Sequence, residues 1–502
     1  MSFQKVIGGG SLVLALSGHA AWAEVTPQDV WADWTRYMEA YGYRVSATES
    51  SSGSRLELSD VELSIVLPED EVEGDVSIAM GDIALVDNGN GTVSVDIPTE
   101  MPILIRFADG DESGEAKLNY TTEGYEMIVS GDPEKLVYEY KAAKAGLALV
   151  ELTEGEQTLD IGMASLTVSD IAGRSQSEQG DLNRTTQEMT SGPVRYALDF
   201  TDVEGGDRFV WEGESASMTL STQAAVPPSA DWTDVEALLG NGFAVEGAFG
   251  FGPGNSSFSV TEDAKMVKGS SNSEGGSLSM NMNEDVLEYR GRFNQVAMQL
   301  AGGDLPFPVA IDAAETGFDL GLPLRESETP QDFSLGFLLG DFTVSDFVWD
   351  LFDPERKLSR DPATLALGLS GTATMRQSLL SEENMEGDEV PGDVNSLSLD
   401  DFRLSVAGAE MTGEGAVEFD HSDTTSYDGM PKPVGDVTMS LKGGNSLLDA
   451  LVEIGLIPQD QALGMRMMMG MFAVAGDGPD DLRSRIEFTD EGQVLANGQR
   501  IK

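Results

Sequence analysis

The stretch LELSDVELSIVLP (residues 56–68) alternates apolar and polar residues with a period of two. Leu56 and Leu58 share one phase, and Val61, Leu63 and Ile65 share the other, because Ser59-Asp60 shifts the pattern by one residue. Successive side chains of a β-strand point to opposite faces of a sheet, so this alternation is typical of a strand with one covered face. The stretch therefore predicts an extended strand, interrupted once at Ser59-Asp60.

The same rhythm recurs along most of the 502 residues, in segments such as DVSIAMGDIAL, GTVSVDIP, KLVYEY and SLTVSDI. Turn-forming residues separate these segments, for example in residues 87–91 (DNGNG) and in Asp109-Gly110. The intervals are too short for the crossover that parallel strands require, so we expect antiparallel hairpins. The predicted fold is mainly β with a few short helices, and its large antiparallel β-meander sheets are closed by a C-terminal helical pair.

A helix is expected directly after residue 26, because Thr26 can cap it, Pro27 suits its first turn, and Gly42 can end it. The letters ADWT occur in this segment at 32–35 and again at 230–233, where residues 230–242 also precede β-type sequence. Two interpretations stay open: the chain holds two duplicated halves, or four shared letters coincide in a long chain. A third short helix is expected at 345–352, and the C-terminal pair at 445–472.

This organisation divides the chain into four parts. They are a signal peptide at 1–23, a helix with a β-meander at 24–225, a second helix with a β-meander at 226–440, and the helical pair with a closing hairpin at 441–502. The signal peptide is predicted from Lys5, the apolar run at 6–16 and the small residues around Trp22 that precede Glu24. We therefore expect a periplasmic protein, exported by a cleavable signal peptide.

The charge balance restricts the partners, since the chain has 87 acidic and 30 basic residues. So acidic a surface repels phosphate backbones, and we expect no nucleic-acid partner. No later stretch has 18 uninterrupted apolar residues, so no transmembrane helix is expected either. Lipid or envelope proteins remain as expected partners.

Catalytic and metal-binding motifs are scarce. The chain has no cysteine and two histidines, of which only His421 follows the predicted signal peptide, so a catalytic triad or a multi-histidine metal site is not expected. The methionine run at 464–472 offers thioether ligands for Cu(I), in Met465, Met467, Met468, Met469 and Met471. The competing interpretation, which we favour, is a pliable core stripe on a helix. We expect no catalytic residue, cofactor or metal.

The candidate binding residues are instead apolar side chains on the predicted helices. They recur at helical spacing, and in the last helix they share a face with Ala462. The set comprises Trp31, Trp34, Met38, Trp232, Met465, Met469 and Phe472.

The region from about residue 331 onward resembles a known family. The resemblance is carried by WDLFDPERKLSRDPATLALGLSG (349–371), GAEMTGEGAVEF (408–419), residues 443–472 and GQVLANGQRI (492–501). These motifs resemble exported bacterial proteins of domain-of-unknown-function family 2125, for which no activity is assigned. The general pattern of hairpins closed by helices is more remotely similar to AsmA-type periplasmic envelope proteins, which implies sheets that face lipid.

Three functions are compatible with these features. The first, which we favour, is a non-enzymatic periplasmic protein that binds lipid or another hydrophobic partner on a curved β-sheet in envelope maintenance. The second is a porin-like outer-membrane β-barrel, although an aromatic content of 7% is low for two interfacial girdles. The third is a hydrolase that uses two carboxylates.

Overall fold

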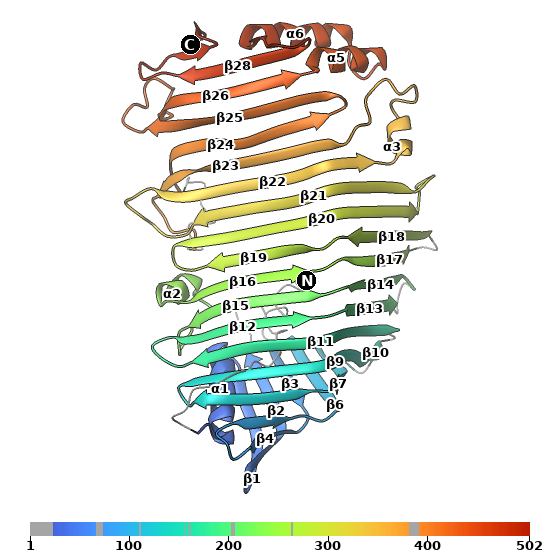
Figure 1. Ribbon diagram of the computed structural model, residues 1–502, viewed down its shortest axis with the longest axis vertical. Helices are drawn as coiled ribbons and strands as arrows, with labels where there is room; N and C mark the ends of the chain where they lie inside the picture. Colours follow the sequence, from blue (N-terminus) through green and yellow to red (C-terminus); the bar gives the residue numbers. More distant parts are fainter. Residues whose placement is uncertain are drawn as a thin grey trace. The chain divides into compact units, whose positions relative to one another are not determined.

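The computed structural model describes residues 24–66, 74–109, 112–155, 157–159, 162–201, 206–262, 265–380 and 391–502. The predicted signal peptide lies outside these ranges. The chain forms two compact units that divide between Ala264 and Lys265. The described residues form antiparallel β-strands and five short helices (Figure 1), which confirms the predicted fold class.

Unit 1 contains two helices, α1 (Pro27–Ala40) and α2 (Val235–Gly240). Its strands are β1 (Arg44–Ser52), β2 (Arg55–Val66), β3 (Gly74–Met80), β4 (Ile83–Asp87), β5 (Val93–Asp96), β6 (Glu100–Asp109), β7 (Glu112–Glu123), β8 (Glu126–Asp132), β9 (Lys135–Glu154), β10 (Gln157–Leu159), β11 (Met163–Glu178), β12 (Asn183–Ser191), β13 (Val194–Thr201), β14 (Arg208–Ser215), β15 (Met218–Val226), β16 (Ala244–Phe251) and β17 (Gly254–Glu262).

Unit 2 contains three helices, α3 (Asp346–Asp350), α5 (Gly444–Glu453) and α6 (Gln459–Phe472). Its strands are β18 (Lys265–Ser273), β19 (Gly276–Met282), β20 (Val286–Gly302), β21 (Val309–Pro323), β22 (Gln331–Val344), β23 (Ala363–Met375), β24 (Gly392–Val406), β25 (Ala409–Asp420), β26 (Lys432–Lys442), β27 (Val474–Ala475), β28 (Asp481–Phe488), β29 (Val494–Ala496) and β30 (Gln499–Arg500).

Long strands in both units pair with two shorter strands along one edge. In unit 1, one edge of β9 is shared by β7 and β8, and β11 pairs with both β12 and β13. In unit 2, β20 pairs with both β18 and β19. From β20 to β26 the strands then follow one another as a simple antiparallel meander, with β28 next to β26.

Helix α1 begins as the sequence predicts. The Thr26 hydroxyl accepts a hydrogen bond from the Asp29 N–H, and the Asp29 carboxylate accepts one from the Thr26 N–H, which together form a capping box. Pro27 occupies the first turn, where the helix needs no N–H donor. The helix contacts β1, β2 and β4 and lies against the sheet there (Figure 1), and its Val30 side chain is buried in the core.

A buried hydrogen-bonded cluster fixes α1 to the sheet. The Asp33 carboxylate accepts hydrogen bonds from the hydroxyls of Tyr138 on β9 (2.5 Å) and Ser177 on β11 (2.8 Å), and it pairs with Arg36. Burial and the nearby Asp33 raise the pKa of Tyr138 well above its usual value, so the phenol keeps its proton and remains a donor. This buried side chain is tolerated because each of these three partners donates a hydrogen bond to it.

The main hydrophobic core of unit 1 lies under α1. Its apolar side chains come from α1 and from strands β2, β4, β5, β8, β9 and β12, and the half-buried Trp31 and Trp34 pack against it. The buried members are Val25, Val30, Leu56, Leu58, Val61, Ile83, Leu85, Val93, Val95, Met127, Val129, Leu136, Tyr138, Tyr140 and Met189.

The second ADWT segment contacts the C-terminal end of α1. The Trp232 indole N–H donates to the carbonyl of Ala40 (2.9 Å), the last residue of α1, and its ring stacks on Tyr41 with centroids 5.3 Å apart. The bond satisfies one of the carbonyls that a helix C-terminus leaves without a partner. Trp232 itself lies in a turn, not on the predicted helix, because Asp234 caps α2 and the helix begins only at Val235.

The predicted parts at 24–225 and 226–440 differ from the compact units. Residues 226–262, with α2, β16 and β17, pack in unit 1, since β16 pairs with β15 and β17 with β14. The second ADWT segment therefore closes the first unit, whereas the duplication of two halves remains a prediction.

The unit 1 core yields a stability prediction. Leu85→Ala removes a fully buried side chain and leaves a cavity, so we expect a loss of about 2–5 kcal/mol in the free energy of unfolding. Leu166→Ala is the matched control on β11 of the same unit, where the side chain is 43% exposed, and we expect less than about 1 kcal/mol. Urea unfolding of both variants measures the difference, and equal losses would contradict the assigned core.

Candidate functional site

One face of the unit 2 sheet is apolar across successive strands. Directly paired residues of neighbouring antiparallel strands point to the same face. One such row runs from Phe318 on β21 through Phe337 and Leu367 to Phe402 on β24. A second row joins Tyr289, Leu320, Leu335, Leu369 and Leu399, and a third joins Leu339, Leu365, Leu404, Met411, Leu441 and Leu482.

Large side chains in these rows remain exposed. Leu335 is 46% exposed and Phe337 is 47% exposed, although both belong to the middle strands of the meander. We call the exposed members the open apolar face, and they are Tyr289, Phe318, Leu335, Phe337, Leu365 and Leu404. A contiguous exposed apolar surface is typical of a site for a hydrophobic ligand or partner.

One β-bulge keeps the apolar residues of β22 on this face. Asp341 in β22 has a positive φ angle of 50°, and the register of β22 with β23 shifts between Leu339 and Phe342. The bulge inserts one extra residue, so the apolar positions resume on the same face beyond it.

The opposite face of the same strands is polar. One row across it contains Gly321, Ser334, Ser370, Ser398, Ala416, Asp436 and Glu487. Its charges are paired, as in the bonds from Arg290 and Arg292 to Asp319 (2.8 and 2.7 Å). A shallow pocket on this side is lined by Glu288, Ser334, Ser370 and Ser398, among others. The sheet of unit 2 is therefore amphipathic in a single layer.

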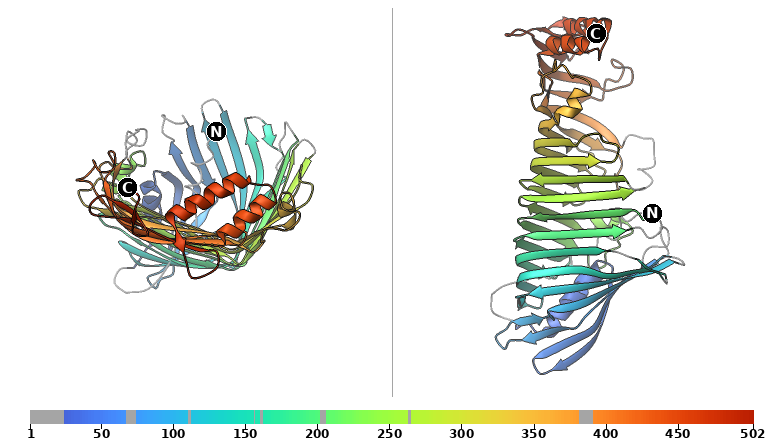
Figure 2. Two further views of the ribbon diagram at one scale, coloured as in Figure 1. Left: turned by 90° about the horizontal axis from the view of Figure 1, so that it is seen from above. Right: turned by 90° about the vertical axis from the view of Figure 1, so that its right-hand side faces the viewer.

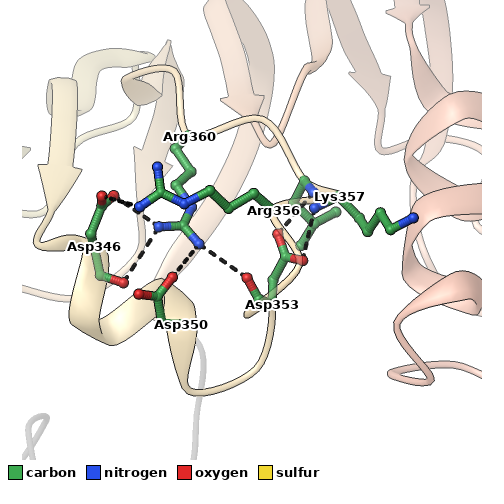
Figure 3. Close-up of polar contacts among 7 residues, drawn as sticks. Asp346, Asp350, Asp353, Arg356, Lys357 and Arg360 are labelled. Carbon is green, nitrogen blue, oxygen red and sulfur yellow. Dashed lines mark hydrogen bonds and ion pairs between the residues drawn. The ribbon is translucent and has the colours of Figure 1, made fainter.

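A charged cluster holds the segment between β22 and β23, residues 345–362, which contains α3 and is called here the α3 loop (Figure 3). The Arg360 guanidinium donates to the carboxylates of Asp346 (2.8 Å) and Asp350 (2.6 Å) and to the carbonyl of Asp353 (3.0 Å). The buried Asp353 carboxylate accepts from the backbone N–H groups of Lys357 and Leu358. The WDLFDPERKLSRDP motif thus forms a fixed loop.

The charges of this cluster lower the pKa of two aspartates. The side-chain hydrogen bond from Arg360 is the main cause for Asp346, and Arg356 adds to it. Burial by itself raises the pKa of Asp353, but the two backbone donors and the nearby cations outweigh it. Both carboxylates are therefore ionised near neutral pH and act as acceptors.

Polar contacts also connect this loop and the segment before β28 to α5. Lys357 Nζ lies 2.6 Å from Glu453 Oε1 on α5. The Asp480 carboxylate accepts from the N–H groups of Asn445 and Ser446 at the start of α5. Helices α5 and α6 lie side by side at the end of unit 2 (Figure 2).

The candidate residues of α6 are only partly covered. Ala462 is fully buried and Met469 is half-buried, as a core stripe requires, but Met465 and Phe472 are 42% and 40% exposed. In α1, Trp31 donates to Glu49 (3.0 Å) and packs with Trp34 on the core, and Met38 is half-buried. The structure thus brings Trp31 and Trp34 together, and it leaves the α6 set largely on the surface.

Chemical groups for catalysis do not converge in the described part of the chain. No group of three or more His, Cys, Asp or Glu residues there is placed to hold a metal ion. His421 Nε2 lies 2.8 Å from the Val394 carbonyl, and Nδ1 lies 3.7 Å from Asp393, which also pairs with Arg376. These contacts connect the turn after β25 with the start of β24.

Comparison with known proteins places this half of the chain. Residues 253–501 match the family described as "Uncharacterized protein conserved in bacteria (DUF2125)". This segment belongs to the DUF2125 family. No curated protein and no solved structure gave a match, so the similarity to AsmA-type proteins stays a prediction. The DUF2125 segment contains the open apolar face, the α3 loop and the α5–α6 pair. Among the described residues, no helix is long and apolar enough to cross a membrane.

The open apolar face was missing from the sequence-based candidates. Its pattern is visible in DFSLGFLLGDF (332–342) and ATLALGLSG (363–371), where apolar residues alternate with small or polar ones. The alternation indicates which residues share a face, and exposure becomes visible only in the structure.

The charged cluster yields a pH-dependence prediction. The folded pKa of Asp346 and Asp353 lies below the unfolded value of about 3.9, so their contribution to stability is present above that pH and is lost as pH falls through the folded pKa. Arg360→Met removes one cause of both shifts. We expect the variant to melt several degrees below wild type at pH 7, and the gap to shrink below about pH 4.

Scanning calorimetry between pH 3 and 7 measures this gap. Arg403→Met, at an exposed position on β24, removes the same charge outside the cluster and is expected to change the melting temperature little. A gap for Arg360→Met that keeps its full size at pH 3 would contradict the assigned role.

Proposed function

We propose that the protein is a non-enzymatic periplasmic protein of the bacterial envelope that binds the acyl chains of lipid on the open apolar face of unit 2. The observation that carries this proposal is the exposure of Leu335 and Phe337, in continuous apolar rows on central strands. Covering these rows with a ligand would remove their apolar surface from water, which contributes about 25 cal/mol of favourable free energy per Å².

The chemistry of the face suits an acyl chain. Its rows consist of aliphatic and aromatic side chains, whereas charged groups occupy the opposite face, as Asp319 and Asp436 do. Each methylene that leaves water contributes about 0.8 kcal/mol, so a chain segment of about six methylenes supplies about 5 kcal/mol without a polar anchor. The face therefore favours ligands by apolar length and gives little selection by headgroup.

The pKa shifts favour binding over carboxylate hydrolysis. A general acid at neutral pH needs a carboxyl group whose pKa is raised. The described aspartates with clear shifts, among them Asp346, Asp353, Asp393, Asp436 and Asp480, all have a lowered pKa, because Arg side chains, backbone N–H groups or amide and hydroxyl groups donate to them.

Lipid extraction tests the binding proposal. The full chain is purified from its own host without detergent, and the lipid per protein is measured by mass spectrometry of an organic extract. The triple variant Leu335→Thr, Phe337→Thr, Leu365→Thr keeps strand-forming residues but removes apolar area, and we expect it to retain less than about a third of the lipid.

The matched control is Ser334→Thr, Ser370→Thr, Ala416→Thr. These positions form one row on the polar face of the same sheet, so the same three residues are introduced on the other side. We expect wild-type lipid content. A clean extract from wild type, or equal lipid in both triple variants, would overturn the proposal.

The periplasmic location has its own test, because it rests on the sequence of residues 1–23. We expect the mature protein to begin at Glu24 and to be released by osmotic shock. N-terminal peptide mapping of the released protein measures both, and an intact N-terminus in the cytoplasmic fraction would contradict this location.

A further inference from the structure

Helix α6 exposes most of its apolar side chains. Met467 is 65% exposed and Met471 is 69% exposed, and Leu463 and Met468 are also more than half exposed. The exposed apolar residues on and next to the helix are called here the methionine patch, and they are Leu456, Leu463, Met465, Met467, Met468, Met471, Phe472 and Val474. Ala462 is the one fully covered residue that the helix contributes.

Polar bonds hold the helix in place. Arg466 donates to the side chain and carbonyl of Asn445 and pairs with Asp449 on α5 (2.7 Å). At the other end, the Phe472 carbonyl accepts from Ser484 (2.6 Å) and Asn497 (2.9 Å). The exposed apolar side chains take no part in these bonds, and they stay available to a partner.

The arc of exposed residues is wide. At about 100° per residue, the exposed side chains from Leu463 to Phe472 span about 200° of the helix circumference. A helix that lies in a protein groove needs an apolar stripe only about 100° wide. An arc twice as wide would not be covered by a groove on a second copy of the chain. A helix partly inserted into the acyl region of a lipid bilayer is in contact with apolar groups over such an arc.

The patch is almost free of charge. Between residues 461 and 476 the single charged residue is Arg466, whose charge is paired with Asp449. The chain as a whole has a formal net charge of −57, so a negatively charged membrane repels it. The helix can therefore bind a lipid surface without net charge, and apolar contact supplies the attraction.

The apolar rows that contain the open apolar face continue to the strand that holds α6. Ser484, which binds the Phe472 carbonyl, pairs with Met439, and Met439 continues the row of Phe402 through Gly413. The same row contains Phe337. The end of α6 is thus attached to β28, which follows β25 and β26 beyond the open apolar face.

We propose that α6 inserts its methionine patch into the interface of a zwitterionic lipid bilayer and so brings the end of the open apolar face to the membrane. The inference rests on the proposed function, because that function gives the membrane contact its role. Methionine suits such a surface, since its unbranched thioether adapts to irregular apolar surroundings. Insertion uses the apolar arc, and Gln459, Asp460 and Gln461 at the start of the helix remain at the headgroups.

Vesicle flotation tests this inference on the full chain. Phosphatidylcholine vesicles are mixed with protein, and the fraction that floats is measured. Met467→Glu with Met471→Glu places two charges in the arc and is expected to lower the bound fraction at least about tenfold. The control Gln459→Glu with Gln299→Glu adds the same charge at exposed positions outside the arc and is expected to bind within about twofold of wild type.

Other outcomes separate the alternatives. Added anionic lipid is expected to weaken flotation, and stronger binding to anionic vesicles would overturn the inference. The wild-type protein could instead fail to float and sediment as a dimer, while the Met467→Glu, Met471→Glu variant sediments as a monomer. That result would show that the methionine patch binds a second copy of the chain and would overturn the inference. The triple variant at Leu335, Phe337 and Leu365 is expected to float like wild type. If the wild-type protein floats but carries no extractable lipid, acyl-chain binding on the open apolar face is overturned and membrane insertion of α6 is not. If it carries lipid but never floats, membrane insertion of α6 is overturned and acyl-chain binding is not.

Discussion

The structure depends on the alternation of side chains across single-layer β-sheets. A strand with a two-residue rhythm gives its sheet one apolar and one polar face, and the apolar face needs a cover. A second sheet or a layer of helices usually supplies that cover. In this chain the helices are short and cannot cover a whole sheet, and the two units differ in how much of the apolar face is covered.

Unit 1 covers part of its sheet with α1, and unit 2 leaves a larger part open. In unit 1 the Asp33 carboxylate binds Tyr138 and Ser177, which fixes α1 over the core. In unit 2 the corresponding polar contacts, such as Asp480 at α5 and Arg360 in the α3 loop, lie at the margins of the sheet. They stabilise loops and helix ends, and the rows through Phe337 and Leu335 stay accessible.

Much of the fold could be predicted because its determinants are local. The capping residues of α1, the phase shift at Ser59-Asp60 and the C-terminal helical pair all appear where the sequence indicates, with Asp60 at a φ of 52°. The environment of Trp232 could not be predicted, because its contact with Ala40 joins residues far apart in the chain. The exposure of Met467 and Met471 could not be predicted either, because it depends on what α6 packs against. Apolar residues at helical spacing indicate a core stripe and a surface patch equally well.

The bulge at Asp341 has a consequence for how this sequence can change length. Phe342 and Val344 share a side with Phe337 and Leu339 only because one surplus residue intervenes. Loss of that residue would transfer Phe342 and Val344 to the polar face of the sheet and would reverse every later position of the strand. Insertions and deletions within such strands are therefore tolerated when they comprise two residues or lie at the hairpin tips. A change of one residue is tolerated chiefly where a β-bulge with the adjoining strand is formed or removed at the same place.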